Sequence, residues 1–251
     1  MGAKKVSVIS LSVRFIIGFV WLSFWSLISI GLMIICLPFR NLRIKLGNLT
    51  GKIIGPVVTR ITGTKIKYSN YSKIHDTKPA IYIMNHASAL DIFVAMALCP
   101  YGGCGVGKKE IVKIPFFGQV YWLSGHLLID RSNRKKAIES MNYLSEQVKN
   151  NNLSIWIWPE GTRSENGKLL PFKKGFAHLA LATNLPIVPV ILHDAHKRWP
   201  AKSMSFYPGE CRIDILDPIK TDSWKRESID EHIEQVRGVM AKAMALSLIH
   251  I

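Results

Sequence analysis

The sequence predicts an α/β protein, in which a mixed sheet is flanked by helices and preceded by an N-terminal, membrane-anchoring helical segment. Two observations support this fold class. After residue 62, short runs rich in β-branched and aromatic residues alternate with longer runs of helical apolar spacing, which is typical of an α/β sheet. Before that point, 25 consecutive residues carry no charge, enough as a helix to cross a hydrocarbon layer of about 30 Å.

The first part, residues 1–62, is predicted to form two membrane-associated helices. The uncharged run covers residues 15–39, and it is too long for a cleaved signal peptide. Whether it spans the bilayer or lies in one leaflet stays open. Residues 40–62 place apolar residues at helical spacing among five basic ones, which predicts an amphipathic helix lying on anionic lipid. Three glycines and Pro56 weaken the case for one unbroken helix.

The formal charge of +16 is concentrated near the N-terminus, where the first 75 residues hold eleven lysines and arginines and no acidic residue. Because more basic residues follow the uncharged run than precede it, we expect the downstream part to face the cytoplasm, at a bacterial inner membrane. Nucleic acid is not expected as a partner, since the N-terminal aromatic residues lie in the uncharged run and not among the cations. The charge therefore favours membrane lipid as a partner.

The second part, residues 63–251, is predicted to be one α/β domain. Four cysteines without a C-x-x-C spacing favour neither disulfides nor structural zinc. The His193-x-x-His196 pair is expected in a surface loop, so no metal is expected. The expected strands are at residues 65–68, 80–84, 104–107, 127–129, 153–158 and 187–192, with a late edge strand at 212–216, and the expected helices are at 90–98, 116–123, 134–149, 175–182 and 228–248.

A strand-to-helix corner carries the first chemical motif, Asn-His-Ala-Ser-Ala-Leu-Asp at residues 85–91. His86 and Asp91 would point about 140° apart on a continuous helix, so they can meet only if His86 precedes the helix and Asp91 lies in its first turn. A carboxylate on one imidazole nitrogen leaves the other free to take a proton from an attacking hydroxyl. The pattern indicates a general base, although a helix capping box beside a loop histidine accounts for the same residues.

The second motif, Trp-Pro-Glu-Gly-Thr-Arg-Ser at residues 158–164, directly follows a predicted strand. Pro159 ends the strand, and Gly161 permits a tight turn that brings Arg163 back over the edge of the sheet. Arginine suits a phosphate there, because its planar guanidinium donates two hydrogen bonds at once. An ordinary turn with a solvated arginine is the alternative.

Further cations lie near a turn and a Pro-x-x-Gly corner at residues 115–118. Lys108 and Lys109 precede this corner, and Arg131 follows the next predicted strand. A solvated charged loop explains these residues as well as a binding role does. The fourth stretch, residues 185–190, has prolines on both sides of a strand and is expected to form a wall beside the site.

In this order the four stretches resemble the glycerolipid acyltransferase family, and within it the 1-acylglycerol-3-phosphate (lysophosphatidic acid) acyltransferases. One block alone would be weak, whereas four ordered blocks are specific, and the resemblance covers about residues 65–220. The matching residues are Asn85, His86, Ser88 and Asp91 in the first block, Lys109, Glu110, Pro115 and Gly118 in the second, 159–164 in the third and 186–190 in the fourth, with Ile111 for the family's Leu and Trp158 for its Phe.

The resemblance implies transfer of an acyl group from an acyl thioester, either acyl-CoA or acyl-carrier protein, to the sn-2 hydroxyl of 1-acylglycerol-3-phosphate, which yields phosphatidic acid. It implies no cofactor beyond the acyl donor, and it names membrane lipid, lysophosphatidic acid and that donor as partners. It makes His86 the general base and Asp91 the residue that orients it. The implied or candidate substrate-binding residues are Lys108, Lys109, Arg131, Glu160, Gly161, Thr162 and Arg163.

Two other functions remain open at this stage. One is acylation of a different lyso-lipid, such as a lysophospholipid or a lyso-ornithine lipid, by the same superfamily. The other is a non-enzymatic protein that binds anionic lipid, against which the joint presence of His86, Asp91 and Arg163 counts. Ser88 is the nearest candidate nucleophile, but its expected role is a helix cap, so direct attack without an acyl-enzyme is expected.

Overall fold

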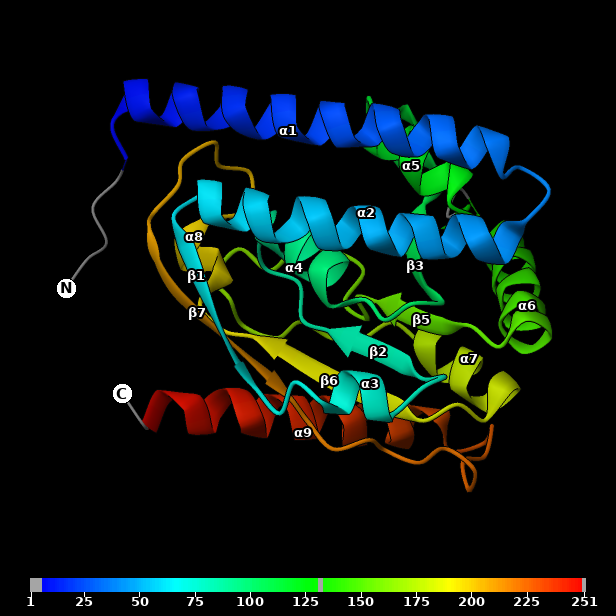
Figure 1. Ribbon diagram of the computed structural model, residues 1–251. Coiled ribbons are helices and arrows are strands. Elements are labelled where there is room, and N and C mark those ends of the chain that lie inside the picture. Colours follow the sequence, from blue (N-terminus) through cyan, green and yellow to red (C-terminus); the bar gives the residue numbers. More distant parts are fainter. Residues whose placement is uncertain (1–5, 131–132, 250–251) are drawn as a thin grey trace.

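The computed structural model describes residues 6–130 and 133–249, and Figure 1 shows a sheet with helices on both faces. The fold class predicted from the sequence is confirmed. The strands are β1 (Thr64–Ser69), β2 (Ile81–Met84), β3 (Gly103–Lys108), β4 (Leu127–Ile129), β5 (Ser154–Ile157), β6 (Ile187–Leu192) and β7 (Gly209–Ile215). The helices are α1 (Val8–Ile35), α2 (Arg40–Ile61), α3 (Lys73–Asp76), α4 (Leu90–Leu98), the 3-10 helix η1 (Lys109–Lys113), α5 (Phe117–Leu123), α6 (Arg134–Asn151), α7 (Gly175–Thr183), α8 (Ala195–Arg198) and α9 (Ile229–Ile249).

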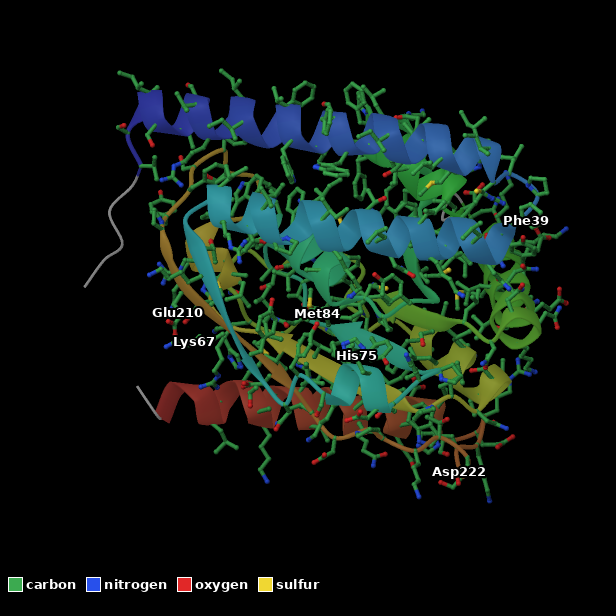
Figure 2. The ribbon with its side chains drawn as sticks, viewed as in Figure 1. Phe39, Lys67, His75, Met84, Glu210 and Asp222 are labelled. Atoms are coloured by element: carbon green, nitrogen blue, oxygen red, sulfur yellow. The ribbon has the colours of Figure 1, made fainter. Side chains whose placement is uncertain are left out.

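The seven strands form one mixed sheet in the order β1-β7-β6-β2-β5-β3-β4. All neighbouring pairs are parallel except β6 and β7, which are antiparallel. The predicted edge position of the strand at 212–216 is therefore wrong: β7 lies between β6 and β1. The reason is that β1 pairs in parallel with the outer edge of β7, and Lys67 of β1 forms an ion pair of 2.9 Å with Glu210 of β7 (Figure 2).

Both faces of the sheet are buried, which is why its central strands are continuous apolar runs and do not alternate with polar residues. On one face, α6, α7 and α9 pack against the isoleucines of β2, β5 and β6. On the other face, α3, α4 and α8 pack against Tyr82, Trp156 and Val190. Helices α2 and α1 lie outside α4 on this second face, so the molecule has additional helical layers there (Figure 1).

Helix α2 is one unbroken helix that contains Pro56, and its glycines lie on its buried side. A Cβ on Gly55 would lie 2.3 Å from the carbonyl oxygen of Phe93, and one on Gly51 would lie 2.8 Å from that of Met96, so only glycine allows α2 to approach α4 this closely. The side of α2 that carries the small residues is its buried side, whereas Leu42 and Leu49 are exposed, and contact of α2 with anionic lipid stays a prediction. Arg40 and Arg43 also bind the domain, through the carbonyls of Gly125 and Leu123.

Helix α1 runs alongside α2 and also contacts α5 (Figure 1). Its buried residues are Ser26, Ser29 and Met33, and the Ser29 hydroxyl lies 2.6 Å from that of Thr50 on α2. Most of its apolar side chains are exposed and project away from the domain (Figure 2). By length and composition, α1 is the one helix in the described part of the chain that could cross a membrane.

Candidate active site

Asn85 joins the carboxyl ends of β2 and β6. Its side-chain nitrogen donates to the carbonyl of Leu192 at 3.1 Å, and its side-chain oxygen accepts from the amide of the same residue at 2.8 Å. Because β2 and β6 are parallel, these two hydrogen bonds hold the strands together where both reach their carboxyl ends, along one edge of the sheet. The next residue, His86, is therefore placed just outside that edge, where ligands bind in open α/β sheets.

His86 and Asp91 are in contact, with Nδ1 of the imidazole 2.7 Å from Oδ2 of the carboxylate. The same oxygen accepts the backbone amides of Ala87 at 2.7 Å and Ser88 at 2.8 Å. Asp91 lies in the first turn of α4, where backbone amides lack helical partners and favour a carboxylate. With Nδ1 directed at Asp91, which is 1 % exposed, Nε2 is the imidazole nitrogen left for a substrate.

Glu160 connects the loop after β5 to the loop that carries His86. Its two carboxylate oxygens accept the amides of His86 at 2.7 Å and Leu170 at 2.8 Å, and the amide of Ser164 donates to the carbonyl of His86 at 2.7 Å. Burial raises the pKa of Glu160 to about 7, although both hydrogen bonds favour its ionised form. Glu160 is 2 % exposed, and it holds the two loops together from behind the cavity wall.

A cavity of about 520 Å³ opens beside His86. One part of its lining is polar and includes His86, Lys108, Thr162 and Arg163, and another part is apolar and is built mainly from α1, α2, α4 and α5. The apolar part would accept a hydrocarbon chain, and the polar part would accept an anionic group. The apolar lining residues include Leu22, Ile54, Ile92, Met96, Val106, Ile111, Ile114, Phe117 and Val120.

The structure separates the cations that the sequence grouped together. Arg163 and Lys108 line the cavity, and the Nε atom of Arg163 has no hydrogen-bond partner within the described residues. Lys109 instead forms an ion pair with Asp130 at 2.8 Å and does not line the cavity. Arg131 lies outside the described residues. Gly161 has φ of +70°, so the turn before Arg163 uses a backbone conformation that favours glycine.

Residues 65–193 match the family model described as Acyltransferase. The chain belongs to the acyltransferase family. It is 44% identical over 223 residues, 89% of this chain and 77% of the other, to the 1-acyl-sn-glycerol-3-phosphate acyltransferase of Limnanthes douglasii. It is 35% identical over 183 residues, 73% of this chain and 74% of the other, to the protein of that name from Escherichia coli (strain K12).

The crystal structure of the 1-acyl-sn-glycerophosphate (LPA) acyltransferase from Thermotoga maritima has a similar fold, with a TM-score of 0.76 over 95% of this chain and 94% of that one. The two sequences are 21% identical, so this structural similarity supports the fold alone. The family membership inferred from the four ordered blocks is thereby confirmed.

The sequence did not point to several residues that line the cavity of this acyltransferase. Lys202 and Glu165 form an ion pair between two loops. Tyr121 and His126 also line the cavity, where burial lowers the pKa of His126 to about 4 and the amide of Gly105 donates to its Nδ1 at 3.0 Å. One signal was present: glycine inside a strand often marks a close approach, and a Cβ on Gly105 would lie 2.9 Å from the Tyr121 hydroxyl.

Proposed function

We propose that this acyltransferase transfers an acyl group from an acyl thioester, acyl-CoA or acyl-carrier protein, to the sn-2 hydroxyl of 1-acylglycerol-3-phosphate and so forms phosphatidic acid. The names of the relatives described above support the acceptor. One structural observation carries the proposal: His86, which is paired with Asp91, lines the same cavity as two cations, Lys108 and Arg163, and a set of apolar side chains. A lyso-lipid with a phosphate has the same two parts, joined by a glycerol hydroxyl.

In the proposed reaction, Nε2 of His86 takes the proton of the sn-2 hydroxyl as its oxygen attacks the thioester carbonyl. An ester C–O bond forms, the C–S bond breaks, and the imidazolium returns the proton to the departing thiolate. Asp91 keeps the proton of the neutral imidazole on Nδ1 and stabilises the imidazolium that forms, because its carboxylate is 2.7 Å away.

Direct transfer fits the surroundings of the other candidate nucleophiles. The Ser88 hydroxyl is buried, donates to the carbonyl of Trp199 at 2.6 Å and accepts the amide of Leu90 at 3.0 Å. Cys104 is buried as well, and burial raises the pKa of its thiol to about 12, so the reactive thiolate is scarce at neutral pH. Neither side chain is arranged to carry an acyl group.

The acceptor's phosphate is assigned to the polar part of the cavity. Arg163 and Lys108 supply two positive charges, which suit a phosphomonoester of charge near −2. Thr162 adds a hydroxyl, and Gly161 gives the loop its turn. Glu160 serves this site by holding the loop, because both of its oxygens already accept backbone amides.

Membrane attachment would bring the cavity to its substrates. The exposed apolar side of α1 is assigned to the bilayer, and Leu22 and Ser26 of the same helix line the cavity. Helix α5 contacts α1 and carries Trp122, which is 59% exposed, and Ile114 shortly before α5 is 48% exposed. The lipid chains of the acceptor can then remain in an apolar environment while its head group reaches His86, on the cytoplasmic side.

The test is acyl transfer by purified full-length protein in vesicles that contain 1-acylglycerol-3-phosphate. Acyl-CoA is the donor in one arm and acyl-carrier protein in the other, and both thiol release and phosphatidic acid are measured. We expect acceptor-dependent thiol release, and a loss of about 10²- to 10⁴-fold in His86→Ala with vesicle binding retained. A His86→Ala variant with the wild-type rate would refute the general base, and product formed only from another lyso-lipid would refute the acceptor.

A further inference from the structure

The indole of Trp158 covers one face of the His86 imidazole. The ring centroids are 4.9 Å apart, and the ring planes differ by 28°. Both residues line the cavity, and Trp158 occupies the position where the acyltransferase family pattern has Phe. We propose that Trp158 is a positioning residue, which holds the imidazole by stacking and stabilises the imidazolium that forms during acyl transfer. This inference rests on the proposed role of His86 as general base.

Asp91 alone does not determine the orientation of the His86 ring. A single hydrogen bond at Nδ1 holds one edge, and the ring can tilt about this contact. Trp158 restricts the tilt from the side, because an indole at stacking distance occupies the space through which the imidazole would swing. Trp158 is itself held in place. It directly follows β5, its backbone carbonyl accepts the amide of Gly161 at 3.1 Å, and its side chain packs against the buried cluster that contains Trp156.

The charge on His86 changes during the proposed reaction. Its ring is neutral before it takes the proton and cationic afterwards, and Trp158 presents the electron-rich face of an indole to it. Among aromatic side chains, tryptophan attracts a cation most strongly. The contact therefore favours the transition state over the ground state, which raises kcat and leaves substrate binding nearly unchanged.

The first test compares Trp158→Leu and Trp158→Phe with the wild type in the vesicle assay, with kcat and the KM of the acceptor measured separately. We expect Trp158→Leu to lower kcat by about 2- to 30-fold, with KM changed less than about twofold. Trp158→Phe restores an aromatic face and should recover part of the loss. Trp224→Leu is the matched control, because Trp224 stacks on His232 with centroids 4.5 Å apart, neither residue lines the cavity, and the variant should keep the wild-type kcat.

Fluorinated tryptophans placed at position 158 alone then separate charge stabilisation from shape. Fluorine withdraws electrons from the ring while its size changes little, so we expect kcat to fall stepwise as fluorine atoms are added. A flat series would overturn the charge part of the proposal. A loss in Trp158→Leu that appears in KM or in the unfolding temperature, with kcat preserved, would overturn the positioning role.

The double variant His86→Ala, Trp158→Leu distinguishes this inference from the function on which it rests. If Trp158 acts through His86, the second substitution adds no loss to the first. Full activity in His86→Ala would refute the proposed function itself. Loss in His86→Ala together with an unchanged kcat in Trp158→Leu would refute only the role of Trp158.

Discussion

One oxygen of Asp91 receives three N–H groups: Nδ1 of His86 at 2.7 Å and the amides of Ala87 and Ser88. The orientation of the imidazole and the start of α4 therefore depend on the same atom. The six residues from His86 to Asp91 supply every donor and acceptor of this contact, which explains why it was apparent from spacing alone.

Asp91→Asn tests this oxygen directly. The amide keeps one acceptor oxygen but cannot stabilise an imidazolium, so we expect acyl transfer to fall by about 10²- to 10⁴-fold. Binding to vesicles should persist. The rate is measured with acyl-CoA and 1-acylglycerol-3-phosphate, and an unchanged rate would reduce Asp91 to a helix-capping residue.

Arg163→Ala tests phosphate recognition. Loss of a charged hydrogen bond should lower kcat/KM for 1-acylglycerol-3-phosphate by about 10- to 150-fold, equivalent to about 1.5–3 kcal/mol. Arg163→Lys should recover only part of the loss, because an ammonium lacks the two-pronged geometry.

The control for Arg163 is a lyso-lipid whose phosphate is already esterified to a head group. Its use by Arg163→Ala should change little. Equal losses with both acceptors would mean that Arg163 maintains the loop, and Lys108 would then become the leading phosphate ligand.

Direct transfer predicts that no acyl group accumulates on the protein. Ser88 is fully occupied by hydrogen bonds and Cys104 is a buried thiol. Incubation with acyl-CoA in the absence of acceptor, followed by mass spectrometry of the intact protein, should show only the unmodified mass. A stoichiometric acyl adduct would require a covalent mechanism instead.

Glu160 should make stability depend on pH. Its pKa is raised from 4.5 to about 7 on folding, so the folded state binds the proton more tightly than the unfolded state does. This contribution to stability is fully present below about pH 4.5 and is lost as the pH rises through about 7. Urea unfolding in detergent should show a larger fall in unfolding free energy between pH 5 and pH 8 for the wild type than for Glu160→Gln. Parallel falls would contradict the raised pKa.

The contact between α2 and α4 should tolerate no side chain at Gly55. A Cβ there would lie 2.3 Å from a backbone oxygen, so Gly55→Ala must displace one helix and should cost about 1–3 kcal/mol. Gly18→Ala in α1 is the control, because a Cβ at Gly18 has no atom within 4 Å among the described residues and alanine favours a helix. Thermal unfolding in detergent compares the two, and equal unfolding temperatures would contradict the close packing.

The sequence by itself determined the fold class, the uncharged helix, most strands and helices, and the His86–Asp91 contact. These features are local: apolar periodicity records which side of a segment faces water, and a five-residue spacing limits which side chains can meet. The four ordered blocks also identified the family before any geometry was known. The order of the blocks along the chain carries this information even when individual residues differ, as Trp158 does.

Only the tertiary structure decided which distant segments meet. It placed β7 inside the sheet, turned Gly51 and Gly55 of α2 toward α4, and brought Glu160 to the amide of His86 across 74 positions of sequence. It also separated Lys109, paired with Asp130, from Arg163 at the cavity. Periodicity cannot reveal such partners, because a buried side chain gives the same apolar pattern whichever element covers it. A charged residue likewise looks the same in the sequence whether it forms an ion pair or binds a ligand.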